Sequence, residues 1–295
     1  MLDMSIEVDV VHDLESNMLL NDASVDYTTS PWTLKECFKM HVIAVLEEQT
    51  NQLIAFYDGD TIPLDGRTHE VDVAGYKVVL QDYKPLEYLH FPLHKFPDYV
   101  KKRKIRKATG HNCINFDLLV YKVYFGLDFD ITEEGDTWAG KPVYHNDTLV
   151  KSKTQNPDRF EHNLDYLSKI AGGAKKVDFR PNVPKELRFE YFGADMLYYN
   201  LFDLLSTKDV DKYLDTEAGK HKWDDPIQLE KCVMHLITQQ AHRGFAFNAE
   251  LAEKCVKELD EFMAERKARV EPMLPPKKAT KTFMKDFTPP KAQFK

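Results

Sequence analysis

The stretch that most constrains the fold of this 295-residue chain is an early apolar run that ends in two acidic residues. Val8 and Val10 alternate with polar neighbours and Val11 adjoins them, which predicts a buried strand near the start of the chain. Residues two apart on a strand point to the same side, so Asp13 and Glu15 project together. Two adjacent carboxylates repel each other unless a cation lies between them, and oxygen ligands suit Mg²⁺ or Mn²⁺. The alternative is an ordinary solvated strand end.

The composition is that of a globular protein with an acidic balance. A hydrophobic content of 43% is enough for a full core, and the formal net charge of −8 argues against a protein that coats duplex DNA by bulk electrostatics. It does not exclude a metal-dependent enzyme that acts on nucleic acid, because such a site is itself acidic. The cysteines lack Cys-x-x-Cys spacing, which predicts reduced core thiols and no zinc or disulfide framework: Cys37, Cys113, Cys232 and Cys255.

No apolar run approaches the roughly 20 residues that a membrane span needs. The first seven residues include two acidic residues and no basic one, whereas a signal peptide is basic and then apolar. The sequence therefore predicts a cytoplasmic protein without a membrane partner, in the host cytoplasm if the chain is of phage origin.

The apolar pattern predicts strands first, then strands mixed with helices, then helices alone. The predicted strands after the first are 37–46 and 53–57, which form a hairpin, followed by 104–110 and 143–150. The predicted helices of this part are 115–125, 163–170 and 186–205. This order favours an α/β domain over residues 1–215, followed by a helical extension over residues 216–295.

The helical extension opens with a well-marked start signal at Asp225-Pro226, and Gly244 ends that helix. Its predicted inner face consists of four apolar residues and one glutamine: Leu229, Val233, Leu236, Ile237 and Gln240. Asn248 caps a further helix, and a Pro- and Lys-rich tail begins near residue 271.

A basic run covers residues 101–107. Such a run is either a solvated face or, because it precedes an acidic motif, a surface that faces phosphate groups. The sequence leaves both interpretations open.

Two further acidic motifs stand later in the chain. Asp117 opens a predicted helix after a strand, and Tyr199 precedes Asp203 by four residues. Residues four apart share one face of a helix, so this phenol and carboxylate can converge on one point. Taken singly, the three residues are also typical of a helix cap, a core aromatic and a solvated helix position.

Taken together, the motifs resemble a known superfamily. Asp-x-Glu on the first strand, an Asp that opens a helix after an Asn and an aromatic residue, and Tyr-x-x-x-Asp on a late helix are similar to the proofreading 3′–5′ exonucleases of RNase H-like fold, in the tyrosine-containing DEDD branch. Within it, segments 13–20, 111–117 and 199–208 resemble the exonuclease domain of phage family A DNA polymerases. Segment 240–248 resembles the junction where such polymerases enter the thumb. The likeness is weakest between residues 20 and 107.

The resemblance implies an RNase H-like α/β fold with a mixed central sheet and a site for two Mg²⁺ or Mn²⁺ ions. Asp13 would bridge the ions, and Glu15 and Asp203 would complete the more tightly held one. Asp117 would hold the second ion largely through waters, and Tyr199 would orient the attacking water.

The resemblance also implies a substrate. Leu19 would pack against the terminal base, while Asn112 and Phe116 would contact the strand end. The expected substrate is a single-stranded or frayed DNA 3′ end, and the expected partner is a polymerase module in the same or a separate chain. A stand-alone exonuclease that trims RNA 3′ ends and a silent support or interaction domain of a polymerase are the alternatives. His162 is a candidate to approach the site.

Overall fold

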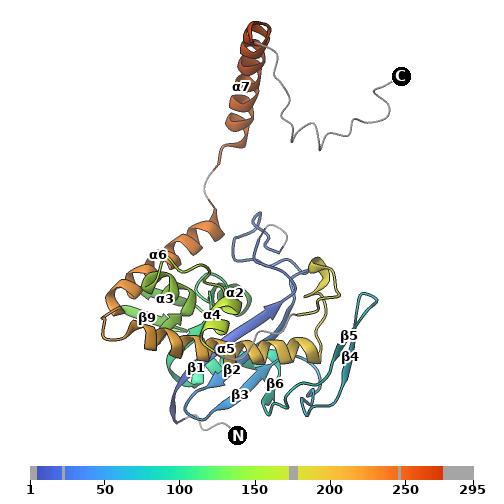
Figure 1. The fold of residues 1–295 in the computed structure, drawn as a ribbon, viewed down its shortest axis with the longest axis vertical. Helices are drawn as coiled ribbons and strands as arrows, with labels where there is room; N and C mark the ends of the chain where they lie inside the picture. Colours follow the sequence, from blue (N-terminus) through green and yellow to red (C-terminus); the bar gives the residue numbers. More distant parts are fainter. Residues whose placement is uncertain (1–4, 22–23, 173–178, 245–246, 275–295) are drawn as a thin grey trace. The chain divides into compact units, whose positions relative to one another are not determined.

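The computed structural model describes residues 5–21, 24–172, 179–244 and 247–274. The chain divides into two compact units, residues 1–244 and 245–295, and each is described by itself. The first unit is an α/β domain built around a six-stranded sheet (Figure 1).

The described strands of the first unit are β1 Glu7–Ser16, β2 Met40–Glu47, β3 Gln52–Phe56, β4 His69–Val73, β5 Tyr76–Leu80, β6 Leu89–Phe91, β7 Lys104–Gly110, β8 Phe129–Thr132, β9 Gly135–Trp138, β10 Lys141–Pro142 and β11 Tyr144–Asp147. Its α-helices are α1 Phe96–Lys102, α2 Asp117–Phe125, α3 Thr148–Gln155, α4 Leu164–Ile170, α5 Ala194–Ala218 and α6 Asp224–Arg243. Short 3₁₀ turns lie at η1 Leu93–Lys95 and η2 Lys185–Leu187.

The central sheet has the strand order β11-β7-β1-β2-β3-β6. β1, β2 and β3 form an antiparallel meander, while β7 and β11 run parallel to β1 on its other side. A three-stranded antiparallel meander extended by two parallel strands is the sheet of the RNase H-like fold. The predicted fold class, an α/β RNase H-like domain with a mixed sheet, is therefore confirmed.

The two faces of β1 belong to different cores. Val10 and Leu14 lie in the cluster on one side of the sheet, and Val11 lies in the cluster on the other. Because side chains alternate along a strand, Asp13 and Glu15 point to the same side as Val11. Helix α5 covers that side (Figure 1), packing its buried apolar residues Ala194, Leu197, Leu201 and Leu204 into the same cluster.

Most predicted elements are present, with two shifts of boundary. The hairpin of β2 and β3 turns at Asn51, whose φ is 51°. The predicted strand 143–150 is wrong in its second half: β11 stops at Asp147, whose side chain caps α3. The predicted helix 186–205 begins later and extends further, as α5, because η2 and a turn precede Gly193.

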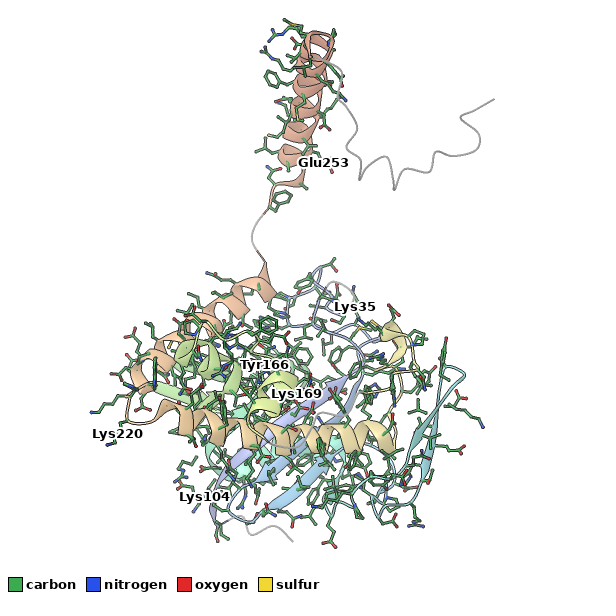
Figure 2. All side chains as sticks on the ribbon, viewed as in Figure 1. Lys35, Lys104, Tyr166, Lys169, Lys220 and Glu253 are labelled. Carbon is green, nitrogen blue, oxygen red and sulfur yellow. The ribbon has the colours of Figure 1, made fainter. Side chains whose placement is uncertain are left out.

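The basic run 101–107 is largely paired within the domain. Arg103, Arg106 and Lys107 each bind a carboxylate of the same unit. These pairs partly neutralise the run, and its interpretation as a phosphate-facing surface stays a prediction. Lys104, at the start of β7, lies at the lower edge of the domain (Figure 2), at the end of the strand opposite Gly110.

Helix α6 buries a polar face instead of the predicted apolar one. The predicted inner residues Leu229, Val233, Leu236 and Ile237 are exposed, and the buried ones are Ile227, Lys231, His235, Thr238 and His242. The reason is a fully buried ion pair in which Lys231 Nζ lies 2.6 Å from Asp136 Oδ2. This contact attaches α6 to the β8–β9 hairpin and places it in the first unit. The boundary predicted between residues 215 and 216 falls inside α5. The division into a domain of residues 1–215 and an extension of residues 216–295 stays a prediction.

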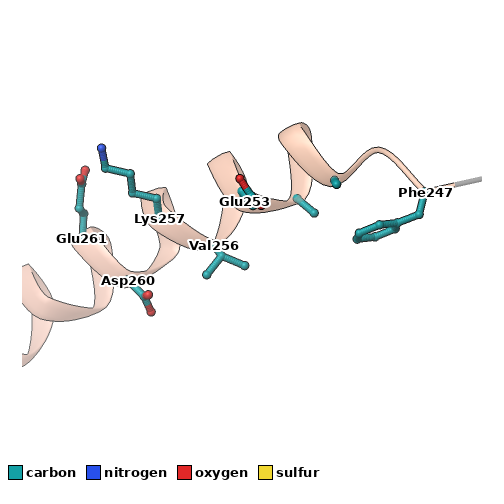
Figure 3. Close-up of a pocket in the computed structure, with 8 residues that line it drawn as sticks. Phe247, Glu253, Val256, Lys257, Asp260 and Glu261 are labelled. Atoms are coloured by element: carbon teal, nitrogen blue, oxygen red, sulfur yellow. The ribbon is translucent and has the colours of Figure 1, made fainter. Parts of the chain in front are cut away.

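The second unit contains α7, Ala249–Val270, followed by η3, Glu271–Met273. Asn248 caps α7 as predicted, since its Oδ1 accepts from the Leu251 N–H at 2.9 Å. Figure 3 shows Val256 and Asp260 on one side of α7 and Lys257 and Glu261 on the other. The predicted Pro- and Lys-rich tail from residue 275 onward lies outside the described residues.

Among the helices that the structure describes, none combines the length and the apolar character that a bilayer crossing requires.

The buried Arg103–Glu47 pair gives a test of the fold. The two side chains are 1% and 0% exposed, and Nε lies 2.7 Å from Oε1. We expect Glu47→Leu to lower the free energy of unfolding by about 3–5 kcal/mol, because the guanidinium stays buried without its partner. Urea denaturation measures the change. The control is Arg106→Leu, which removes an exposed pair with Asp9 and should leave the midpoint unchanged. An unchanged midpoint for Glu47→Leu would contradict the prediction.

Candidate functional site

All eight predicted site residues line one open cleft of about 890 Å³. They come from the end of β1 and the loop after it, the loop after β7, the start of α2 and the middle of α5: Asp13, Glu15, Leu19, Asn112, Phe116, Asp117, Tyr199 and Asp203. The tertiary structure therefore gathers in one place what the sequence spreads over nearly 200 positions.

Three of the four predicted metal ligands form a tight group. Oxygen atoms of Asp13, Glu15 and Asp203 all lie within 4.8 Å of one another. Asp13 and Glu15 reach this point because they share one face of β1, and Asp203 reaches it from α5, which covers that face. Three carboxylate oxygens so close together are a suitable ligand set for one hard divalent cation.

Asp117 stands beside this group without being part of it. It is only 4% exposed, and its Oδ1 has no hydrogen-bond partner among the described residues. Burial and the negative charge of Asp13 hold the pKa of Asp117 well above its usual range. A cation held between Asp13 and Asp117 would satisfy the buried oxygen and relieve this repulsion. The carboxylates of Asp13, Glu15 and Asp203 thus fit a divalent ion, and Asp117 offers a further buried carboxylate in the same cleft.

Tyr199 lies one helical turn before Asp203 and also faces the cleft. Burial raises the pKa of its phenol, and the charges of Asp203, Glu15 and Asp13 raise it further. The Tyr199 ring is held by the ring of Phe179, with the centroids 4.7 Å apart. The hydroxyl group therefore stays protonated at neutral pH and can hydrogen-bond to a water or an oxyanion in the cleft.

The loop between β7 and α2 is tightly constrained. A Cβ atom at Gly110 would lie 2.5 Å from the Cβ of Cys113, so the chain can turn here only with glycine. Asn112 has a φ of 62°, in the left-handed region that asparagine tolerates better than most residues. This turn directs Asn112 and Phe116 to the rim of the cleft.

Asp147 holds this loop in place, a role that the sequence did not reveal. Its carboxylate is buried and accepts from the N–H groups of Asn112 and Ile114, each at 3.0 Å. It also accepts from Leu149 at 2.9 Å and Val150 at 3.3 Å, which caps α3. The apolar run after it predicted a strand, but Asp-Thr before Leu-Val is equally typical of a helix start.

Two apolar side chains stand exposed at the cleft. Leu19 is 64% exposed, where the sequence predicted a contact with the terminal base. Phe160, which the sequence analysis did not select, is 84% exposed. Exposed apolar groups beside a polar site are typical of a surface that a ligand covers.

His162 lines the cleft, as the sequence allowed. Its Nδ1 lies 2.9 Å from the Oγ of Ser152, a buried residue of α3. This bond fixes the segment before α4 against α3. Gly172 follows α4 with a φ of 67°, in the left-handed region typical of a residue that ends a helix.

No protein-family model matches the chain, and no curated protein matches it either. Three of the solved structures that the chain matches are the following. Brucella melitensis NrnC is 14% identical, with a TM-score of 0.46 over 83% of this chain and 90% of that one. NrnC with bound Mg²⁺ is 17% identical, with a TM-score of 0.43 over 83% and 90%. A structure described as the apo form of a nuclease is 11% identical, with a TM-score of 0.43 over 82% and 89%. At these values the likeness carries no weight for the site, which rests on the geometry above.

Asp147 gives a test of the loop. We expect Asp147→Ala to lower the free energy of unfolding by about 2–4 kcal/mol, because it removes a helix cap and leaves buried N–H groups unpaired. The matched control is Asn163→Ala, which removes the single capping bond to Tyr166 at 2.8 Å and should cost about 1 kcal/mol. Thermal and urea denaturation measure both. Equal losses for the two variants would refute the role of Asp147.

Proposed function

We propose that the chain is a metal-dependent exonuclease that shortens single-stranded nucleic acid from the 3′ end with two bound Mg²⁺ or Mn²⁺ ions. The observation that carries this proposal is the group of Asp13, Glu15 and Asp203 oxygens within 4.8 Å, with buried Asp117 beside it in the same cleft. A domain that only supports a partner has no physical reason to gather these charges, because their repulsion destabilises the fold.

When bound, a pair of ions supplies a hydroxide-like water near neutral pH and stabilises the charge on the leaving oxygen. In this chain Asp13, Glu15 and Asp203 would hold one ion, and Asp13 with Asp117 would hold the other. Tyr199 keeps its proton and orients the attacking water through its hydroxyl group.

The substrate end is held by the rim of the cleft. Leu19 offers an exposed apolar side chain to the terminal base, and Phe116 packs nearby against the core. Asn112 offers an amide to the sugar or phosphate. Contacts of this kind recognise an unpaired strand with little preference for sequence.

The first candidate for the biological substrate is DNA, with the chain acting as the proofreading module of a phage family A polymerase. The resemblance of segments 13–20, 111–117 and 199–208 supports it. The polymerase module would then lie in the same or a separate chain.

The second candidate is an exonuclease that trims RNA 3′ ends. The position of α6 favours this candidate, because the buried Lys231–Asp136 ion pair attaches this helix to the nuclease unit. Segment 240–248, which begins on α6, carries the resemblance to the thumb junction of a polymerase, and a helix integral to the nuclease unit needs no polymerase to explain it. The carboxylate chemistry is the same for both substrates, since both present a phosphodiester.

The double variant Asp13→Ala, Glu15→Ala tests the activity. We expect digestion of a 5′-labelled single strand with Mg²⁺ or Mn²⁺ to fall by a factor on the order of a thousand or more, because the shared ligand is lost. Circular dichroism should show an intact fold, and EDTA should stop the wild-type enzyme. The control is Glu133→Ala, Glu134→Ala, which removes the same charge from exposed positions outside the cleft. Full activity of the Asp13→Ala, Glu15→Ala variant would mean that other residues carry out the digestion.

A side-by-side assay separates the two substrates. Single-stranded DNA and RNA of one sequence, labelled at the 5′ end, are digested by the same preparation with Mg²⁺. The proofreading candidate predicts a ladder of single-nucleotide steps and faster digestion of DNA. Faster digestion of RNA would favour the second candidate, an exonuclease that trims RNA 3′ ends. Cutting of a circular single strand would contradict exonuclease action altogether.

A further inference from the structure

A buried amide beneath the carboxylate group has no part in the predicted site. Asn200 lies on α5, directly after Tyr199 and one turn before Asp203, and it is 0% exposed. Its Nδ2 donates to Asp13 Oδ2 at 2.7 Å. This bond joins α5 to β1 across 187 positions of sequence, and Asp13 is the carboxylate that would serve both ions of the proposed function.

The amide is an unfavourable choice for the fold alone. Its Oδ1 is buried without a hydrogen-bond partner among the residues that the structure describes. Buried amides normally pair both polar ends, and an unpaired acceptor costs stability. The apolar residues of α5 on the same sheet face are leucines, among them Leu197, Leu201 and Leu204. A leucine at position 200 would match the polarity of these surroundings and has the same branching and number of side-chain heavy atoms as asparagine, with a larger volume.

What the amide contributes is a directed donor. A carboxylate on its own can rotate, and it can present either oxygen to a cation. A donor on Oδ2 constrains the plane of the Asp13 carboxylate and occupies one lone pair of Oδ2, so the carboxylate meets a cation in one orientation.

We propose that Asn200 is a positioning residue that orients Asp13 for metal binding, an inference that rests on the proposed function. Groups that hydrogen-bond to a metal ligand typically change metal affinity or activity 10- to 100-fold when they are replaced. Asn200 acts through Asp13 and does not itself contact the substrate.

The test is Asn200→Leu, compared with wild type and with Ser206→Ala. Ser206 is a matched control because it is also buried on α5, and its hydroxyl donates to the Phe202 carbonyl of the same helix, at 3.2 Å. The first measurement is Mn²⁺ binding to the protein without nucleic acid, by electron paramagnetic resonance. The second is the thermal midpoint without metal. The third is the dependence of kcat and KM on Mg²⁺.

For Asn200→Leu we expect the Mn²⁺ dissociation constant and the Mg²⁺ activation constant to rise about 10- to 100-fold. The KM for a single-stranded oligonucleotide at saturating Mg²⁺ should stay unchanged, and the thermal midpoint without metal should equal or exceed that of wild type. Ser206→Ala should bind Mn²⁺ as wild type does. Asn200→Ala, which removes the donor without adding bulk, should weaken Mn²⁺ binding equally and serves if Asn200→Leu does not fold.

Unchanged Mn²⁺ affinity in both Asn200 variants would overturn this inference, whatever happens to the thermal midpoint. Failure of the wild type to bind Mn²⁺ and to shorten a single strand would overturn the proposed function instead. The two failures are therefore distinguishable.

Discussion

The packing of α5 across the sheet is the contact on which the site depends. Val11 on β1 and Leu197 and Leu201 on α5 share one apolar cluster, and the same two elements carry Asp13 and Asp203. Each buried leucine stabilises the fold by about 1.5–3 kcal/mol. Two like charges 4.8 Å apart repel by roughly 3–4 kcal/mol at an effective dielectric constant of 20. The apolar stripe can therefore hold the carboxylates together, and a bound cation would turn their repulsion into attraction.

The part of the cleft that is formed by the loop after β7 depends on polar contacts. Asp147 gathers backbone N–H groups from the loop after β7 and from the start of α3, so one buried carboxylate orders two segments. The left-handed turn at Asn112 and the absence of a side chain at Gly110 complete the geometry. Burial raises the pKa of Asp147, and its backbone hydrogen bonds act in the opposite direction. The loop that presents Asp117 is thus fixed before any ligand arrives.

Helix α6 shows where pattern and packing diverge. Its apolar stripe predicted an inner face, yet Lys231 and Asp136 meet in the interior and turn that stripe outward. A buried ion pair is costly unless both charges are satisfied, and here Lys231 also donates to the His145 carbonyl at 2.8 Å. Periodicity reports which residues share a face of the helix. It does not report which face the rest of the domain selects.

The sequence by itself determined the local elements and the identity of the acidic motifs. Alternation placed Asp13 with Glu15, and helical spacing placed Tyr199 with Asp203, because both periods follow from backbone geometry alone. Only the tertiary structure decided that Asp203 joins the first pair while Asp117 stands apart, and that Asn200 and Asp147 support them. Those contacts join residues far apart in the chain, and no local period records them. They arise when apolar burial brings α5 and α2 against the sheet.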